Sequence, residues 1–265
     1  MNDKILDTLA DCTRKRIEKD KEKIPLSEMK AKALAMNCNT GFSFEKALKK
    51  NGMSYICEIK KASPSKGIIA ENFPYLEIAK EYEQSGASAI SVLTETNYFL
   101  GNDKYLEEIS KTVSTPIIRK DFTVDEYMIY QAKVLGSSAV LLICSLLDTD
   151  TIRQYISICD ILGLSALVEA HNEEEIKSAI NAGARIIGVN NRNLKNFTVD
   201  ITNSTKLRSL VPQNIIFVAE SGIKTSQDIS ALKNANVDAV LIGETFMKSN
   251  NKKEMLITLN GGELN

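Results

Sequence analysis

The 265-residue chain is 43% hydrophobic and 25% charged, the composition of a globular protein with a large core rather than of a disordered chain. Its 33 Lys and Arg against 34 Asp and Glu give a net charge of −1, which excludes the broad basic field that attracts nucleic acid or an anionic membrane. No apolar run approaches the roughly 20 residues that cross a bilayer, no signal peptide is recognisable, and no Cys-x-x-Cys pair occurs, so we expect a cytoplasmic protein with reduced thiols.

Residues 1 to about 50 have the periodicity of helices, and we expect them to extend the domain that follows. The first predicted helix has one apolar face, formed by Ile5, Leu6, Leu9, Cys12 and Ile17. The basic run Arg14, Lys15 and Arg16 is interpreted as part of the solvated face of this helix.

From residue 51 onward, short apolar runs alternate with amphipathic helical stretches, the pattern of parallel β-α units. The runs predicted as strands are Tyr55–Lys60, Ala89–Leu93, Ile117–Lys120, Ala139–Ile143, Ala166–Glu169, Ile186–Asn190, Ile215–Glu220 and Ala239–Ile242. Such a set of strands closes into a barrel more readily than it stays open. The predicted fold class is α/β, a single (βα)8 TIM-barrel domain over 1–265, with an N-terminal helical extension at 1–50 and the barrel at 51–265. An open doubly wound sheet is the alternative, and the lack of a Gly-x-Gly-x-x-Gly turn argues against it.

A weak internal repeat supports this count of strands. The helices ahead of the even-numbered strands end in residues that tolerate a left-handed cap: Gly86, Gly136, Gly183 and the step from Asn234 to Asn236. The copies recur about every 50 residues, which corresponds to two β-α units.

Several predicted strands end in ionisable or amide side chains directly after apolar residues. These side chains are Glu58, Lys60, Lys120, Glu169, Asn190, Arg192, Glu220 and Ser221. The carboxyl ends of barrel strands form the active face, so we expect these groups to converge there. Lysine and glutamate gathered in a partly desolvated pocket have shifted pKa values and can exchange protons near neutral pH. The pattern therefore predicts acid-base chemistry.

A phosphate site is predicted after the last two strands. Ser221-Gly222 and Gly243-Glu244 follow them, where barrel enzymes often bind phosphate through backbone N–H groups. Tight turns are the alternative interpretation of the two glycines. The polar first β-α loop, from Ser63 to Gly67, adds hydroxyls and Lys66 near the same mouth.

The sequence indicates neither a metal site nor a nucleophilic triad. The single histidine, His171, has no cluster of ligands around it, and we interpret it as a capping or surface residue. Cys57 and Cys144 fall in apolar runs and are expected to pack in the core.

The ordered motifs CEIKKASPSKG, SVLTE, IIRKDF, LVEAH, GVNNRNL, VAESG and VLIGETFM resemble those of the indole-3-glycerol-phosphate synthase family of tryptophan biosynthesis. The resemblance covers essentially the whole chain, including the helical extension. It implies ring closure, decarboxylation and dehydration of 1-(2-carboxyphenylamino)-1-deoxyribulose 5-phosphate, with no cofactor. We expect the partner to be this small phosphorylated substrate, with no nucleic acid and no membrane, and we expect a monomer.

The resemblance also implies roles for residues. Lys120 would be the general acid of ring closure, with Lys60 and Glu169 as a second acid-base pair whose roles are left open. The other positions that match the family are Glu58, Asn190 and Ser221 as catalytic residues, Leu93, Phe99, Phe122, Leu194, Arg192 and Glu220 around the substrate, and Ser63, Gly222, Gly243 and Glu244 around the phosphate. Glu244 departs from the serine of some relatives, although a backbone N–H contact survives that change. A Schiff-base aldolase, an aminosugar-phosphate isomerase and a non-catalytic ligand-binding barrel are the alternatives.

Overall fold

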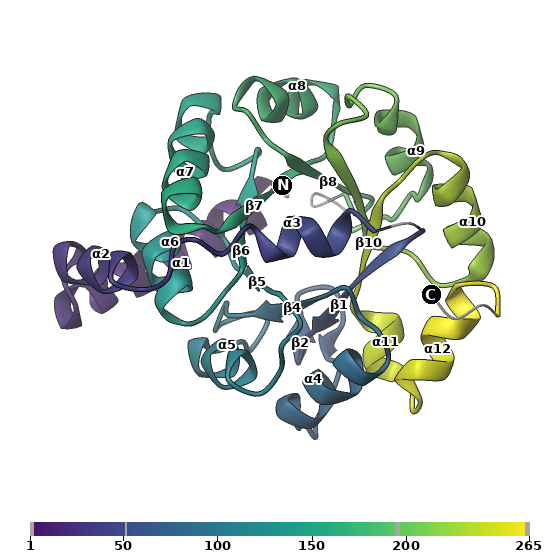
Figure 1. The fold of residues 1–265 in the computed structure, drawn as a ribbon, viewed down its shortest axis with the longest axis horizontal. Helices are drawn as coiled ribbons and strands as arrows, with labels where there is room; N and C mark the ends of the chain where they lie inside the picture. Colours follow the sequence, from purple (N-terminus) through teal and green to yellow (C-terminus); the bar gives the residue numbers. More distant parts are fainter. Residues whose placement is uncertain (1–2, 51, 194–196, 263–265) are drawn as a thin grey trace.

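The computed structural model describes residues 3–50, 52–193 and 197–262 and contains a closed barrel of parallel strands (Figure 1). Its strands are β1 (Ser54–Ile59), β4 (Ala89–Leu93), β5 (Ile117–Lys120), β6 (Ala139–Ile143), β7 (Ser165–Ala170), β8 (Ile186–Asn190), β9 (Ile216–Glu220) and β10 (Ala239–Ile242). Each strand pairs with its neighbours in chain order, and β1 pairs with both β4 and β10. The predicted TIM barrel is confirmed. The alternative prediction of an open sheet is wrong, because β1 pairs with β10 and so closes the barrel.

Helices follow the strands and lie outside the barrel (Figure 1). They are α4 (Tyr75–Gln84), α5 (Asp103–Ser110), α6 (Glu126–Val134), α7 (Thr149–Leu162), α8 (Glu173–Asn181), α9 (Thr202–Arg208), α10 (Ser226–Asn234), α11 (Glu244–Lys248) and α12 (Lys252–Leu259). The predicted left-handed positions are confirmed, because Gly86, Gly136, Gly183 and Asn236 all have positive φ.

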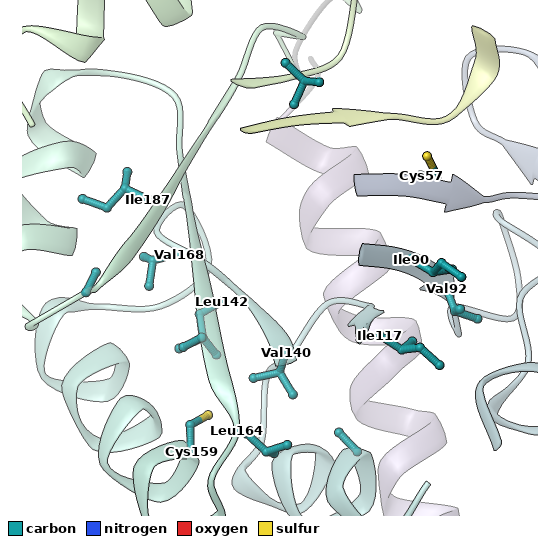
Figure 2. Close-up of a cluster of buried hydrophobic side chains, with 14 of the residues drawn as sticks. Cys57, Ile90, Val92, Ile117, Val140, Leu142, Cys159, Leu164, Val168 and Ile187 are labelled. Carbon is teal, nitrogen blue, oxygen red and sulfur yellow. The ribbon is translucent and has the colours of Figure 1, made fainter. Parts of the chain in front are cut away.

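The alternation of side chains along each strand divides the core into two layers. Ile56, Ile118, Leu167 and Val218 belong to a cluster inside the barrel. Their sequence neighbours belong to a larger cluster between strands and helices, part of which Figure 2 shows with Cys57, Ile117 and Val168 among its residues. Cys57 is therefore in the core as predicted.

The N-terminal extension consists of α1 (Asp3–Lys23), α2 (Leu26–Leu34) and α3 (Ser43–Leu48). In Figure 1, α3 lies in front of the barrel and the fainter α1 behind it. Phe44 and Leu48 of α3 join the interior cluster, so this helix closes the amino-terminal end of the barrel and leaves the other end open for a site.

The prediction of a solvated face for Arg14, Lys15 and Arg16 is wrong for Arg16. Its guanidinium donates to the Asp121 carboxylate at 2.6 Å and to the Thr94 carbonyl at 3.0 Å. Arg14 and Lys15 are exposed. Arg16 thus ties α1 to the barrel rim.

The first β-α loop contains a short antiparallel hairpin, β2 (Ala62–Ser63) with β3 (Gly67–Ile68), which the sequence did not predict.

Across the described residues, no helix has the length and apolar character needed to traverse a bilayer.

Candidate active site

The predicted polar strand ends point into the barrel at its carboxyl-terminal rim. Glu58, Lys120, Glu169 and Glu220 each lie two residues beyond an interior apolar side chain of the same strand, so strand geometry turns them inward. They line a cavity of about 890 Å³. Every predicted site residue in the described part of the chain lines this cavity; Leu194 lies outside the described residues.

Lys120 lies between two glutamates at the floor of the cavity. Its Nζ is 3.1 Å from Oε2 of Glu169 and 3.5 Å from Oε2 of Glu220. Burial would lower the pKa of Lys120, but Glu169 and Glu220 raise it above its usual range. Burial would likewise raise the pKa of Glu169, but Lys120 and His171 hold it well below its usual range.

The Glu220 carboxyl has the opposite shift. Burial, with added repulsion from Glu169, raises the pKa of Glu220 to about 8 despite the attraction of Lys120. At neutral pH the group around Lys120 therefore contains an ammonium, a carboxylate and a carboxyl that retains its proton. Such a set can both donate and accept protons.

Glu58 and Lys60 form a second pair at the end of β1. Oε1 of Glu58 and Nζ of Lys60 are 2.5 Å apart, and both side chains are largely buried. This pair places the ammonium of Lys60 in the cavity as a second one, and the carboxylate of Glu58 fixes its position.

Asn190, Arg192 and Ser221 complete the polar wall. Asn190 donates from Nδ2 to Oε1 of Glu169 at 3.4 Å and accepts the backbone N–H of Arg192 on Oδ1 at 3.0 Å. The guanidinium of Arg192 donates to the carbonyl of Phe197 at 3.3 Å. Ser221 has a φ of 69°, an uncommon left-handed conformation for a residue with a side chain.

One side of the cavity is apolar. Leu93, Phe99 and Phe122 line it, with the two phenylalanine rings 6.1 Å apart. The carboxylate of Glu95 accepts the backbone N–H groups of residues 97 to 99 and so fixes the loop that carries Phe99. Ile5, Leu6 and Leu9 of α1 line the same cavity; the apolar face of this helix was predicted, but its place at the site was not.

The predicted phosphate residues Ser63, Gly222, Gly243 and Glu244 lie at the mouth of the cavity together with three lysines, Lys66, Lys224 and Lys248. The carboxylate of Glu244 is 2.7 Å from Nζ of Lys248 and 3.9 Å from Nζ of Lys66. The hydrogen bond from Lys248 is the main reason that the pKa of Glu244 is lowered. Lys224 and Lys248 were not predicted from the sequence, because isolated lysines in polar segments resemble ordinary surface residues.

The interpretation of His171 as a surface residue is wrong, because its side chain is only 16% exposed. Its neighbour Asn172 caps α8 by accepting the backbone N–H of Glu175, while the backbone N–H of His171 donates to the Glu175 carboxylate at 2.7 Å. The ring, however, lies between Glu169 and Glu175, in contact with the candidate active site. Cys144 follows β6 rather than lying within it, and it is partly buried against the core.

A closed parallel barrel with two lysines and three glutamates converging at its open end has the architecture of a TIM-barrel enzyme, whose active site lies at that end. Sequence comparison identifies which one. The family model described as indole-3-glycerol phosphate synthase matches residues 6–259. The chain belongs to this family.

Individual relatives agree with the family model. The chain is 59% identical to the indole-3-glycerol phosphate synthase of Ruminiclostridium cellulolyticum over 97% of its length and 99% of the relative. It is 54% identical to that of Endomicrobium trichonymphae over 95% and 98%. The solved structure of thiamine phosphate pyrophosphorylase from Pyrococcus furiosus matches with a TM-score of 0.58 at 17% identity, over 79% of this chain and 94% of that one, which shows the fold alone. The predicted family and enzyme class, a carboxy-lyase of tryptophan biosynthesis, are confirmed.

Proposed function

We propose that the cavity at the carboxyl-terminal rim converts 1-(2-carboxyphenylamino)-1-deoxyribulose 5-phosphate into indole-3-glycerol phosphate, carbon dioxide and water. The activity follows from membership of the family. The observation that supports this site is the convergence of Lys60, Lys120 and Glu169 in one cavity. Convergence is what a reaction with several proton transfers on one bound substrate requires.

Ring closure needs an acid at the substrate ketone. The electron-rich arene carbon that bears the carboxylate attacks the ketone carbon, and the ketone oxygen must gain a proton as the new carbon-carbon bond forms. Lys120 is the proposed donor, because its ammonium projects into the cavity between Glu169 and Glu220. Loss of carbon dioxide then returns the electron pair to the ring.

Dehydration needs an acid for the departing hydroxyl and a base for a carbon-bound proton. Glu169, which Lys120 and His171 keep ionised, is the proposed base. Lys60, held by Glu58, is the proposed acid. The proton from carbon goes to Glu169, the hydroxyl leaves as water with a proton from Lys60, and the indole ring becomes aromatic.

The walls of the cavity suggest how the substrate is bound. The anthranilate ring would lie against Leu93, Phe99 and Phe122, and its carboxylate near Asn190, Arg192 and Ser221. The phosphate would bind at the mouth through Ser63 and the backbone at Gly222, Gly243 and Glu244, with the mouth lysines adding positive charge. A monomeric state, a cytoplasmic location and independence from cofactors stay predictions.

The direct test is to add the aminodeoxyribulose phosphate to the purified chain and follow indole fluorescence. We expect turnover that is unaffected by chelators and added cofactors. No fluorescence change with folded protein would reject the function. A Schiff base trapped on Lys120 by borohydride would instead favour the aldolase alternative.

A further inference from the structure

His171 is the only histidine in the chain and lies between two carboxylates. Its Nε2 is 3.4 Å from Oε1 of Glu169, and its Nδ1 is 3.0 Å from Oε2 of Glu175. A neutral imidazole carries a proton on one nitrogen only, whereas an imidazolium can donate from both. Only the Nδ1 contact is a hydrogen bond; Nε2 lies within ion-pair distance of Glu169 without a hydrogen-bond partner of its own. A ring placed between two carboxylates in this way is stabilised in its charged form.

Glu175 is held firmly in its place at the start of α8. Its carboxylate accepts the backbone N–H of His171 at 2.7 Å, the hydroxyl of Ser145 at 2.8 Å and the side-chain amide of Asn172 at 3.2 Å. A carboxylate fixed by neutral donors keeps its charge for the ring. Burial would lower the pKa of His171, but the two neighbouring carboxylates, Glu169 and Glu175, raise it to about 10.

The other groups around the ring do not replace these carboxylates. The nearby thiol of Cys144 stays neutral, because burial raises its pKa to about 12. From α9, Asn203 donates to the carbonyl of His171 at 3.3 Å. Lys120 lies on the far side of Glu169, at Oε2.

The ring also lines a second, polar cavity of about 720 Å³, which shares Leu6, Asn190 and Arg192 with the substrate cavity. Asp7, Asp200 and Arg192 line this cavity with His171 and Glu175. The ring therefore forms part of the wall behind Glu169, on the side away from Lys120.

We propose that His171 is a positioning residue: held as an imidazolium by Glu175, it keeps the carboxylate of Glu169 ionised and oriented for proton transfer. Oε1 of Glu169 faces His171 and Asn190, while Oε2 faces Lys120. The carboxylate is thus fixed from both sides, and of its two Oε1 partners only His171 carries charge. The inference rests on the proposed role of Glu169 as the base.

Three variants test the inference: His171→Gln, Glu175→Gln and the double variant. We expect His171→Gln to lower kcat/KM about tenfold, because one pKa unit, or about 1.4 kcal/mol of interaction between a buried charge pair, corresponds to a factor of about ten. Glu175→Gln removes a group that raises the pKa of the ring, so the ring loses its proton at lower pH. Its kcat/KM should then fall with rising pH in a new alkaline limb below about pH 10. The double variant should lack this limb, because glutamine does not titrate.

The single histidine allows a direct readout of its charge. In an untagged chain, NMR of the imidazole should show a ring that stays charged through neutral pH, and one that titrates earlier in Glu175→Gln. Glu173→Gln is the matched control, because Glu173 lies in the same helical turn, exposed and paired with Lys177. It should change neither the ring titration nor the pH profile.

Two results would overturn the inference. One is a wild-type ring that titrates near the ordinary value of about 6.5. The other is an alkaline limb in Glu175→Gln that persists in the double variant, since it would not come from His171. If His171→Gln does not fold, Glu175→Gln still carries the test. Failure of the proposed function looks different: the wild type would not turn over the substrate, while the ring titration would still report on the imidazolium.

Discussion

Gly243 lies directly against the carboxylate of Glu58. A Cβ built on Gly243 would stand 2.5 Å from Oε1 of Glu58 and 3.1 Å from Nζ of Lys60. The φ of Gly243 is −112°, which other residues adopt freely, so the backbone does not require glycine here. Glycine is required because the Glu58–Lys60 pair occupies the space that a Cβ would need. Gly243 therefore leaves room for Lys60, the proposed acid, and also lines the mouth of the cavity.

We expect Gly243→Ala to lower kcat by about 10- to 100-fold, because the methyl group displaces Glu58 and Lys60 and such misplacement costs rate steeply. Overpacking should also cost about 1–3 kcal/mol of stability. Indole fluorescence and urea unfolding measure the two effects. In the control Gly183→Ala the methyl meets no atom within 4 Å, so only stability should fall. Wild-type turnover in Gly243→Ala would contradict the argument.

Much of the site could be predicted from the sequence, because strand geometry is regular. Glu58 and Lys120 each follow an interior residue by two positions, and parallel strands bring such positions to one rim. The fold followed from the same periodicity. Helix caps could also be placed, because Gly86 and Asn236 are residue types that tolerate positive φ.

The parts that were missed depend on contacts between distant segments. Arg16 and Asp121 are 105 residues apart, and no local pattern distinguishes Arg16 from the exposed Arg14. His171 follows an ordinary strand end, and its two carboxylate partners become visible only once β7 and α8 are placed in space. Local periodicity predicts which face a residue is on, but not what approaches that face.

Lys120→Ala should lower kcat by about 10²- to 10⁴-fold with little change in KM, because general-acid assistance is lost in the transition state only. The variant also leaves Glu169 and Glu220 without the ammonium between them. Lys104→Ala, at an exposed position in α5, is the control for loss of a lysine. If Lys120→Ala retains full turnover, another group donates the proton.

Glu220 should make stability fall as pH rises. Its folded pKa is about 8, above the value of about 4.3 for an unfolded chain. Between these values the folded state holds a proton that the unfolded state has lost, so the contribution of this carboxyl is complete below about pH 4 and is lost as pH rises through 8. Relative to Glu220→Gln, the wild-type free energy of unfolding should therefore decrease from pH 4 to 8. An increase over that range would reject the raised pKa.

Glu244→Gln should strengthen substrate binding. The change removes a negative charge from the mouth and frees Lys248 and Lys66 from their ion pairs. For partly exposed charges we expect KM to fall about two- to fivefold, with a smaller effect at high salt. Glu254→Gln in α12 makes the same change of charge at an exposed position outside the cavity. A higher KM for Glu244→Gln would mean that the Glu244 side chain itself contributes to binding.

Arg16 and Arg14 offer a comparison of two ion pairs on one helix. Arg16 pairs with Asp121, whose side chain is fully buried, whereas Arg14 pairs with Asp11 where both partners are exposed. Arg16→Gln should cost about 3 kcal/mol of unfolding free energy, the lower end for a broken buried pair, because Arg119 remains 3.6 Å from Asp121. Arg14→Gln should cost less than about 1 kcal/mol.

The Arg16 variant should also bind substrate less well. Asp121 follows Lys120 directly, and Ile5, Leu6 and Leu9 of the same α1 line the substrate cavity, so a loosened helix disturbs one wall of the site. Urea unfolding and KM, measured side by side for the two variants, separate the effects. Equal losses of stability in Arg14→Gln and Arg16→Gln would show that the contact with Asp121 does not hold α1 on the barrel.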